Sequence, residues 1–319
     1  DNEAEKEAML INHSNDACSQ IWPTPWHQSG FFHQYQHDGI TRQIYINHKQ
    51  SNKPCLLLIH GFPTSCYDWK PMWLTLAKHF HLITLDLLGY GLSDKPSNVD
   101  YSFSLQANII EDVLKHQGIK EFHILAHDYG DTVAQELLAR HGQLGNNGVF
   151  NIKSTILLNG GLFPETTRPI FTQKILLSPV GFLVAKLFSF KKFIANFNYI
   201  CYQKIPVADL AIHWQLIQHN KGVDVIHKVI QYIRERQINR QRWVNALQQY
   251  SQPLRLINGI CDPVSGQDTL MRFEQLIEQA DTIALLETGH YPQIENPHAV
   301  LVHCMNFWRQ HKMIKPVDK

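Results

Sequence analysis

Residues 122–140 read FHILAHDYGDTVAQELLAR, and this stretch decides the fold. Residues 122–126 form an apolar run typical of a buried strand, and residues 131–140 carry a helical pattern. Between them, alanine and glycine stand two positions before and two positions after Asp128, which lets the chain turn sharply there. This pattern predicts a nucleophile elbow, a turn that projects its central side chain into a reaction site. In the alternative interpretation, Asp128 only caps the helix that follows.

Other short apolar runs alternate with longer helical stretches along the chain. They span residues 55–60, 82–86, 155–159, 254–259 and 282–286. Runs without polar alternation are typical of strands buried on both faces, as in parallel sheets. Near the start, residues 31–37 and 40–47 flank the turn dipeptide Asp38-Gly39, which predicts an antiparallel hairpin. We therefore expect an α/β fold with a mostly parallel, eight-stranded sheet.

A long stretch without strand patterns interrupts this order. Residues 164–246 carry helical patterns only and separate the strand ending at Asn159 from the strand starting at Leu254. Ligands bind beside the carboxyl ends of strands in open α/β sheets, so we expect this insertion to be a helical cap over a site. The predicted parts are an N-terminal extension (1–30), a core (31–163 and 247–319) and a cap (164–246).

Composition and charge exclude several classes of protein. Lys and Arg number 29 and Asp and Glu 28 in 319 residues, so the net charge of +1 provides no field that would collect nucleic acid. The longest apolar run, residues 175–185, contains Pro179 and is much shorter than the roughly twenty residues of a bilayer span. The six cysteines show neither CxxC pairs nor zinc spacing, which predicts free thiols, a cytoplasmic location and no metal site.

Two further residues stand where an elbow nucleophile needs partners. Asp262 lies three residues past the strand ending at Gly259, and His290 follows the last strand with a glycine before it. The order nucleophile, acid, histidine is the one that hydrolases with this elbow use. Neither GxSxG nor GxCxG occurs in the chain, so a serine or cysteine nucleophile is not expected. We predict Asp128 as the nucleophile, His290 as the base and Asp262 as the acid that orients it.

Two backbone amides are candidates for holding an oxyanion. His60-Gly61-Phe62-Pro63 ends an early strand, where the chain can aim the Phe62 N–H at the site. The Tyr129 N–H, directly after the elbow, is the predicted second donor. The alternative is that these four residues form an ordinary glycine-proline turn.

Five motifs together resemble a known superfamily. They are HGFPTSCYDW (60–69), DLLGYGLSDKP (86–96), AHDYGDTVAQELL (126–138), NGGLFPETTRP (159–169) and GHYPQIENP (289–297). The set resembles the α/β-hydrolases, in particular the Asp-nucleophile branch of epoxide hydrolases and haloalkane dehalogenases, and within it the mesoderm-specific transcript type. The resemblance covers about residues 31–310. It implies a cofactor-free, two-step reaction in which Asp128 forms an alkyl ester and His290 activates the water that hydrolyses it.

The resemblance also bears on the leaving group. Dehalogenases of this branch usually place tryptophan after the nucleophile, whereas Tyr129 stands there in this chain. Epoxide hydrolases use two cap tyrosines as proton donors, and the match points to Tyr199 and Tyr232, with Tyr202 as a substitute for either. Buried cap tyrosines that merely pack are the alternative. We expect an epoxide hydrolase acting on a small apolar substrate and water. A dehalogenase-like enzyme and a catalytically silent scaffold or binding protein are the other possibilities.

The predicted cap is rich in aromatic and basic residues. Seven of the sixteen phenylalanines fall between residues 163 and 197, which predicts either an apolar face above the site or the core of the cap itself. Five basic residues oppose Glu165 alone in the same segment: Arg168, Lys174, Lys186, Lys191 and Lys192. Peripheral contact with an anionic membrane is one interpretation, and a solvated basic face is the other. We expect the later run of Arg234, Arg236, Arg240 and Arg242 to be solvated. The sequence leaves the oligomeric state open.

Overall fold

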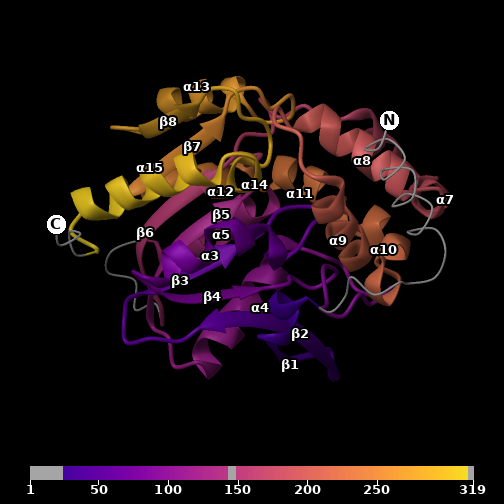
Figure 1. Cartoon of the computed structure of the whole chain (residues 1–319), viewed down its shortest axis with the longest axis horizontal. Helices are drawn as coiled ribbons and strands as arrows, with labels where there is room; N and C mark the ends of the chain where they lie inside the picture. Colours follow the sequence, from indigo (N-terminus) through magenta and orange to yellow (C-terminus); the bar gives the residue numbers. More distant parts are fainter. Residues whose placement is uncertain (1–23, 143–148, 315–319) are drawn as a thin grey trace.

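A twisted eight-stranded sheet forms the centre of the molecule (Figure 1). The computed structural model describes residues 24–142 and 149–314. The strands are β1 (Phe31–His37), β2 (Ile40–Lys49), β3 (Cys55–Ile59), β4 (His81–Leu85), β5 (Glu121–His127), β6 (Asn151–Leu158), β7 (Leu254–Gly259) and β8 (Asp281–Leu285). Their order across the sheet is β1-β2-β4-β3-β5-β6-β7-β8. Strand β2 pairs antiparallel with β1 and β4, and the remaining neighbours are parallel. The predicted fold class is confirmed.

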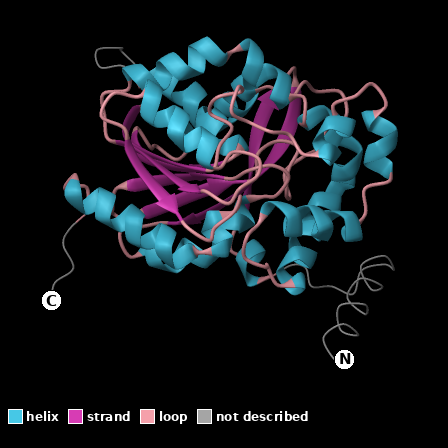
Figure 2. Ribbon diagram, turned by 90° about the horizontal axis from the view of Figure 1, so that it is seen from above, coloured by secondary structure: helices cyan, strands magenta, loops and turns pink. Residues whose placement is uncertain are grey.

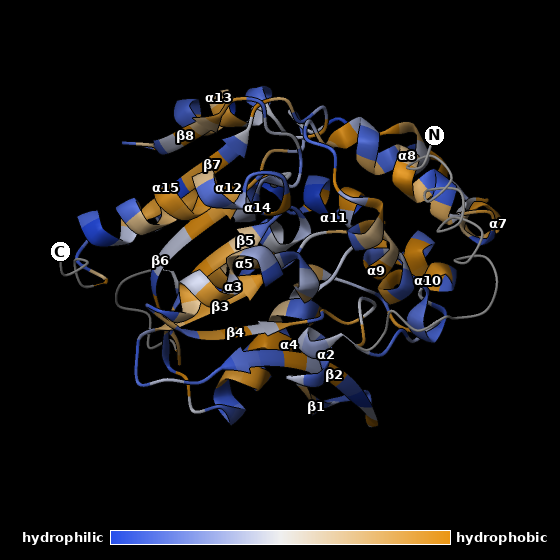
Figure 3. Cartoon of the chain, viewed as in Figure 1, coloured by the Kyte–Doolittle hydropathy of each residue, from blue (hydrophilic) through white to orange (hydrophobic). Residues whose placement is uncertain are grey.

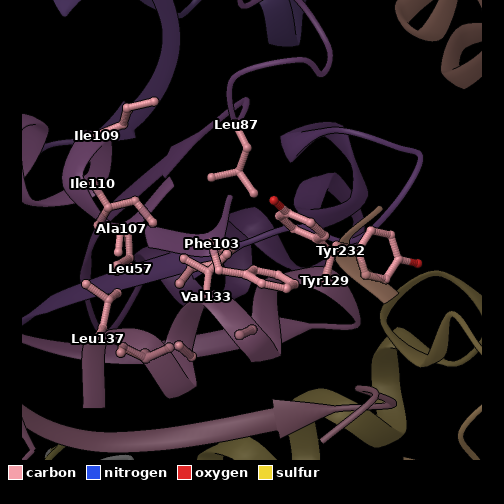
Figure 4. Close-up of a cluster of buried hydrophobic side chains, with 14 of the residues drawn as sticks. Leu57, Leu87, Phe103, Ala107, Ile109, Ile110, Tyr129, Val133, Leu137 and Tyr232 are labelled. Carbon is pink, nitrogen blue, oxygen red and sulfur yellow. The ribbon is translucent and has the colours of Figure 1, made fainter. Parts of the chain in front are cut away.

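Helices cover both faces of the sheet (Figure 2). Those outside the insertion are α2 (Pro25–Gln28), η1 (Cys66–Trp69), α3 (Lys70–Ala77), α4 (Phe103–His116), α5 (Tyr129–His141), α13 (Gln267–Leu276), α14 (Pro292–Glu295) and α15 (Pro297–Gln310). Side chains alternate between the faces of each strand, which divides the core in two. Leu57 and Ile124 pack in the cluster of α4 and α5 shown in Figure 4, whereas Leu56 and Leu58 pack in the cluster of α3 and α15.

The segment between β6 and β7 is helical, and we call it the helical insertion. It comprises α6 (Phe171–Leu176), α7 (Gly181–Lys186), α8 (Phe190–Ile200), α9 (Val207–Gln218), η2 (His219–Lys221), α10 (Gly222–Val229), α11 (Tyr232–Ile238) and α12 (Arg240–Gln249). Helices α8 and α9 share a small core built around Phe193, Phe197 and Trp214. Among the described residues, no helix is long and apolar enough to cross a membrane.

Two predicted part boundaries differ from the structure. Helix α12 packs on α5, where the Trp243 indole N–H donates to Glu136 at 2.8 Å, so the boundary expected after residue 246 falls inside a helix that is attached to the core. At the other end, residues 24–30 belong to the core rather than to an extension. Trp26 is buried, with its ring centroid 4.7 Å from that of Trp73. Residues 1–23 of the predicted extension lie outside the described part.

Candidate active site

The turn between β5 and α5 has the geometry of a nucleophile elbow. Asp128 adopts φ 49° and ψ −106°, a strained conformation for a residue with a side chain. A Cβ on Gly130 would lie 2.4 Å from the Ile59 carbonyl oxygen, which explains why glycine is needed there. The Asp128 side chain makes no capping hydrogen bond to α5, so the helix-cap interpretation is wrong. The side chain is free to project from the strand end instead.

Asp128 meets two of its predicted partners at this turn. Its Oδ2 accepts the Phe62 N–H at 3.1 Å and lies 3.9 Å from His290 Nε2. The second distance is too long for a direct hydrogen bond, but a small shift of the imidazole would close it. Asp128 and His290 are each 4% exposed. The structure therefore brings the predicted nucleophile, base and first amide donor together.

A network of hydrogen bonds fixes His290 from behind. Its Nδ1 lies 2.7 Å from Asp262 Oδ2. The carboxylate of Asp262 also accepts from Asn159 Nδ2 and Ser265 Oγ, both at 2.9 Å, and from the Val264 N–H at 2.7 Å. Because these donors hold the carboxylate in place, the imidazole is oriented with Nε2 toward Asp128. Sequence analysis missed Asn159, although a polar residue at the carboxyl end of β6, beside β7, was a usable signal.

Arg236 is a second residue that sequence analysis missed. Its Nη2 donates to the Asp128 carbonyl oxygen at 3.0 Å and lies 3.5 Å from Asp128 Oδ1, while its Nε donates to Thr132 at 2.9 Å. Its side chain is 5% exposed, so the prediction that it is solvated was wrong. The usable signal was the spacing to Tyr232, four residues earlier on α11, because residues four apart share a helix face.

The other arginines of that run are more exposed than Arg236 and make their contacts away from Asp128. Arg234 donates to the Leu177 carbonyl oxygen at 2.8 Å, Arg242 pairs with Glu136 at 2.9 Å, and Arg240 pairs with Glu165. Helix α11 therefore turns Tyr232 and Arg236 inward and leaves Arg234 outside.

Opposite charges make the buried site electrically balanced. Burial alone would raise the pKa of Asp128, but His290 and Arg236 outweigh it and hold that pKa below its usual range. Burial would lower the pKa of His290, yet Asp262 and Asp128 raise it well above 6.5. The pKa of Asp262 is likewise lowered by His290 against the effect of burial. Two carboxylates and two cations thus compensate each other, which buried charges require.

The predicted proton donors of the insertion are placed very differently. Tyr232 is 2% exposed, and its ring centroid lies 5.5 Å from that of Phe62 and 4.6 Å from the Arg236 guanidinium carbon. Burial, followed by the nearby Asp128 charge, raises the pKa of its phenol, so the O–H stays protonated. Figure 4 shows Tyr232 beside Tyr129, whose ring packs against Phe103 in the core.

Tyr199 and Tyr202 are corrections to the prediction. They are 64% and 53% exposed and do not enter the site. The reason is the rotation of α8, which buries Phe193, Phe197 and Ile200 on one face. At 100° per residue, Tyr199 falls on the opposite face and points to solvent. The motif match predicted the correct segment but not the side that faces the site.

Known proteins similar in sequence to this chain identify its family. Residues 54–175 match the family described as the alpha/beta hydrolase fold. The mesoderm-specific transcript protein of Mus musculus is 38% identical over 294 residues, which cover 88% of this chain and 86% of that protein. The chain belongs to this family of α/β-hydrolases. The predicted superfamily and its mesoderm-specific transcript type are thereby confirmed.

More distant similarities link this hydrolase to an epoxide hydrolase by sequence and to a haloalkane dehalogenase by structure. Epoxide hydrolase 3 of Mus musculus is 32% identical over 96 residues, covering 30% of this chain and 26% of that protein. The solved structure of the haloalkane dehalogenase DbeA from Bradyrhizobium elkani USDA94 superposes with a TM-score of 0.72 at 19% identity. The match covers 89% of this chain and 99% of DbeA, and it shows a shared fold.

An apolar pocket of this hydrolase adjoins His290 and Phe62. Its cavity volume is about 50 Å³, and the wider space of about 510 Å³ between the lining residues includes open solvent. The insertion lines most of it, through Ile170, Thr172, Gln173, Leu176, Phe188, Phe193, Asn196, Phe197, Ile200 and Ile226. Of the seven clustered phenylalanines, three therefore face the pocket. Phe163 and Phe190 are buried elsewhere, and Phe171 and Phe182 are exposed, so both interpretations of the cluster hold in part.

A cluster with metal-ligand character lies elsewhere in the described part of the chain. His33 of β1 and Asp112 and His116 of α4 offer ligand atoms within 4.8 Å of one another. They already pair among themselves, with His33 Nε2 2.7 Å from Asp112 Oδ2. Within the described ranges, no such cluster includes Asp128, Asp262 or His290.

Proposed function

We propose that this hydrolase forms a covalent ester on Asp128 and that its substrates are small apolar epoxides. The observation that carries the proposal is the Asp128 carboxylate at the elbow, with Oδ2 3.1 Å from the Phe62 N–H and 3.9 Å from His290 Nε2. A serine hydrolase would hold a hydroxyl at this point. Since Oδ2 already occupies the amide site, Oδ1 is the oxygen that remains for attack.

In the first step, Oδ1 attacks an epoxide carbon and the carbon–oxygen bond of the ring breaks. The developing alkoxide takes a proton from the Tyr232 phenol, which regains one from solvent. Arg236 and His290 keep Asp128 ionised, because they hold its pKa low in spite of burial. A buried, aligned carboxylate is a better nucleophile than a solvated one. The product of this step is a hydroxyalkyl ester of Asp128.

In the second step, formation of the ester on Asp128 lowers the pKa of His290 and so makes its imidazole available as a base. The esterified Asp128 carries no charge, so one of the two carboxylates that raise the pKa of His290 is lost. The imidazole then releases its proton more readily and can deprotonate a water that attacks the ester carbonyl. The oxyanion forms on Oδ2, where the Phe62 N–H already donates, and the Tyr129 N–H is the proposed second donor. On collapse the ester bond breaks, the leaving alkoxide takes the proton from the His290 imidazolium to complete the diol, and the Asp128 carboxylic acid releases its proton to solvent, which restores the carboxylate.

The two alternatives have less support. In a dehalogenase-like reaction, the residue after the nucleophile would offer an N–H to halide, but Tyr129 packs its ring against Phe103 in the core. A silent scaffold would need neither a strained Asp128 nor two buried carboxylates balanced by two cations, which are costly to maintain.

The experiment is to trap the intermediate. His290→Gln removes the base of the second step, so the variant exposed to an aryl epoxide is expected to accumulate a mass increase on the peptide that contains Asp128. A bromoalkane and a nitrophenyl ester, tested in parallel, separate epoxide opening from halide release and ester cleavage. Asp128→Asn is the control and should remain unmodified. An unmodified His290→Gln protein with every substrate would contradict the ester mechanism.

A further inference from the structure

The first half of the helical insertion carries an excess of basic residues. Between Glu165 and Asp209 the chain has six basic residues and no acidic one, although the net charge of the whole chain is only +1. The remainder of the molecule is therefore net negative. Of the basic residues, Arg168 pairs with Asp268. Within the described residues, Lys174, Lys186 and Lys191 form no ion pair with a carboxylate and are exposed.

Large apolar side chains lie exposed in the same segment. Phe171 is 77% exposed, Leu187 66%, Leu183 52%, Val180 52% and Phe182 47%. Soluble proteins rarely gather such side chains on one surface without a binding role. We call the surface on the outward side of α6 and α7 the outer face; its exposed residues are Phe171, Lys174, Val180, Phe182, Leu183, Lys186 and Leu187. Figure 3 shows α7 in orange at the edge of the molecule.

Helix geometry places the lysines among these apolar residues. On α7, Gly181 and Ala185 are buried against the neighbouring helices, whereas Phe182, Leu183 and Lys186 are exposed. At 100° per residue these three span one face, with Lys186 between the two apolar side chains. On α6, Phe171 and Lys174 are three residues apart and point outward together.

The opposite side of the same helix lines the substrate pocket. Thr172, Gln173 and Leu176 of α6 contribute to the pocket, and so does Phe188, directly after Leu187. Helix α6 therefore has the outer face on one side and the pocket on the other. A molecule held at the outer face lies one helix away from the space beside His290.

We propose that the outer face docks on an anionic lipid bilayer and that the pocket takes its apolar substrate from that bilayer. The second half rests on the proposed function, whereas the docking does not. Exposed Phe, Leu and Val insert below the headgroups, and Lys174 and Lys186 meet the phosphates. A protein partner fits less well, because protein interfaces are depleted in lysine and enriched in Tyr, Trp and Arg.

Vesicle flotation of the full chain tests the docking. The protein is expected to float with phosphatidylcholine vesicles that contain phosphatidylserine, less with phosphatidylcholine alone, and less as salt is raised. The double variant Phe182→Ser/Leu183→Ser should bind at least about tenfold more weakly. Lys174→Glu/Lys186→Glu should weaken binding by about tenfold or more, and only to anionic vesicles. Leu74→Ser and Lys78→Glu are the matched controls. Both residues are exposed on or directly after α3, outside the helical insertion, so these variants should bind like the wild type.

Further measurements distinguish docking from catalysis, from misfolding and from self-association. Asp128→Asn should bind vesicles like the wild type, so loss of catalysis and loss of docking are distinguishable. Unchanged melting curves and unchanged turnover of a water-soluble epoxide in both double variants would show that their fold and pocket are intact. Equal binding by variants and controls, or displacement by inorganic phosphate alone, would overturn the proposal. A lipid-free dimer that Phe182→Ser/Leu183→Ser dissociates would also overturn it, because the occupant would then be a second copy of the chain.

Discussion

The sheet and the helical insertion supply the site in different ways. From the sheet come Asp128, Asp262 and His290, each within five residues of the end of a parallel strand and bonded to neighbouring strand ends. From the insertion come Tyr232 and Arg236, placed by the rotation of a seven-residue helix. A strand end fixes position through the hydrogen-bond ladder, whereas a short helix fixes it only through packing. The sheet half of the site is therefore expected to set the reaction and the insertion half to set rate and substrate.

The sharpest test of the sheet half is Asp128→Asn. The amide keeps the size of the carboxylate but is not a nucleophile, so epoxide turnover should fall by about 10⁴-fold or more. The matched control is Asp131→Asn, three residues on. Burial raises the pKa of Asp131 well above its usual range, which favours the neutral acid over the carboxylate, so its amide analogue should retain near wild-type rates. Single-turnover kinetics with an aryl epoxide provide the measurement, and equal loss in both variants would contradict the assignment of Asp128.

The site residues that follow strands could be predicted from the sequence, whereas the positions of those in the helical insertion could not. The proximity of Asp128 and His290 could be predicted because strand, turn and order along the chain are local patterns, and that of Phe62 because it follows another strand by three residues. Arg236 was missed because an arginine in a charged run is usually solvated, and only its contacts with Asp128 and Thr132, about a hundred residues away in the sequence, explain its burial. Tyr199 was misplaced because a motif match does not define the rotation of α8. Packing between distant segments decided both cases, and no local pattern records it.

Arg236→Met tests the insertion half at its strongest contact. Removing one member of a buried ion pair leaves Asp128 less compensated, which should lower the free energy of unfolding by roughly 3 to 5 kcal/mol. The alkylation rate should fall by about 10³. Without this cation the pKa of Asp128 rises, so the acid limb of the alkylation rate should move to higher pH. Arg234→Met, on the solvent side of the same helix, should change neither quantity.

A purely structural role for Arg236 is distinguishable from this. Loss of stability with an unshifted pH profile would mean that Arg236 positions α11 and does not tune Asp128. Arg236→Lys keeps the charge but cannot reach both Thr132 and Asp128, so it should restore the pH profile better than the stability.

Tyr232→Phe sharpens the comparison within the insertion. Loss of one donor aimed at a developing alkoxide should slow alkylation by an epoxide about 10²-fold, while hydrolysis of the ester on Asp128 stays nearly unchanged. Tyr199→Phe is the matched control and should behave like the wild type, because that phenol is exposed on the far side of α8. Rapid-quench separation of the two steps gives both rates. A slowed Tyr199→Phe would restore the two-tyrosine prediction, and equal loss in both steps of Tyr232→Phe would indicate a displaced insertion.

The smallest expected effect returns to the sheet half, at Ser265. Its hydroxyl donates to Asp262 Oδ2, the same oxygen that lies against His290 Nδ1. Ser265→Ala removes that donor and leaves more negative charge on the oxygen, so the pKa of His290 should rise further. Less neutral imidazole is then present near pH 7, and ester hydrolysis should slow by about fivefold, the value of one typical hydrogen bond. Alkylation should be unaffected, since in the proposed mechanism it uses Asp128 and Tyr232. The variant is therefore expected to show more alkylated enzyme at steady state and an ester-hydrolysis profile displaced to higher pH. A fall in both steps, or a profile displaced to lower pH, would mean that Ser265 holds the loop after β7 rather than the charge of Asp262.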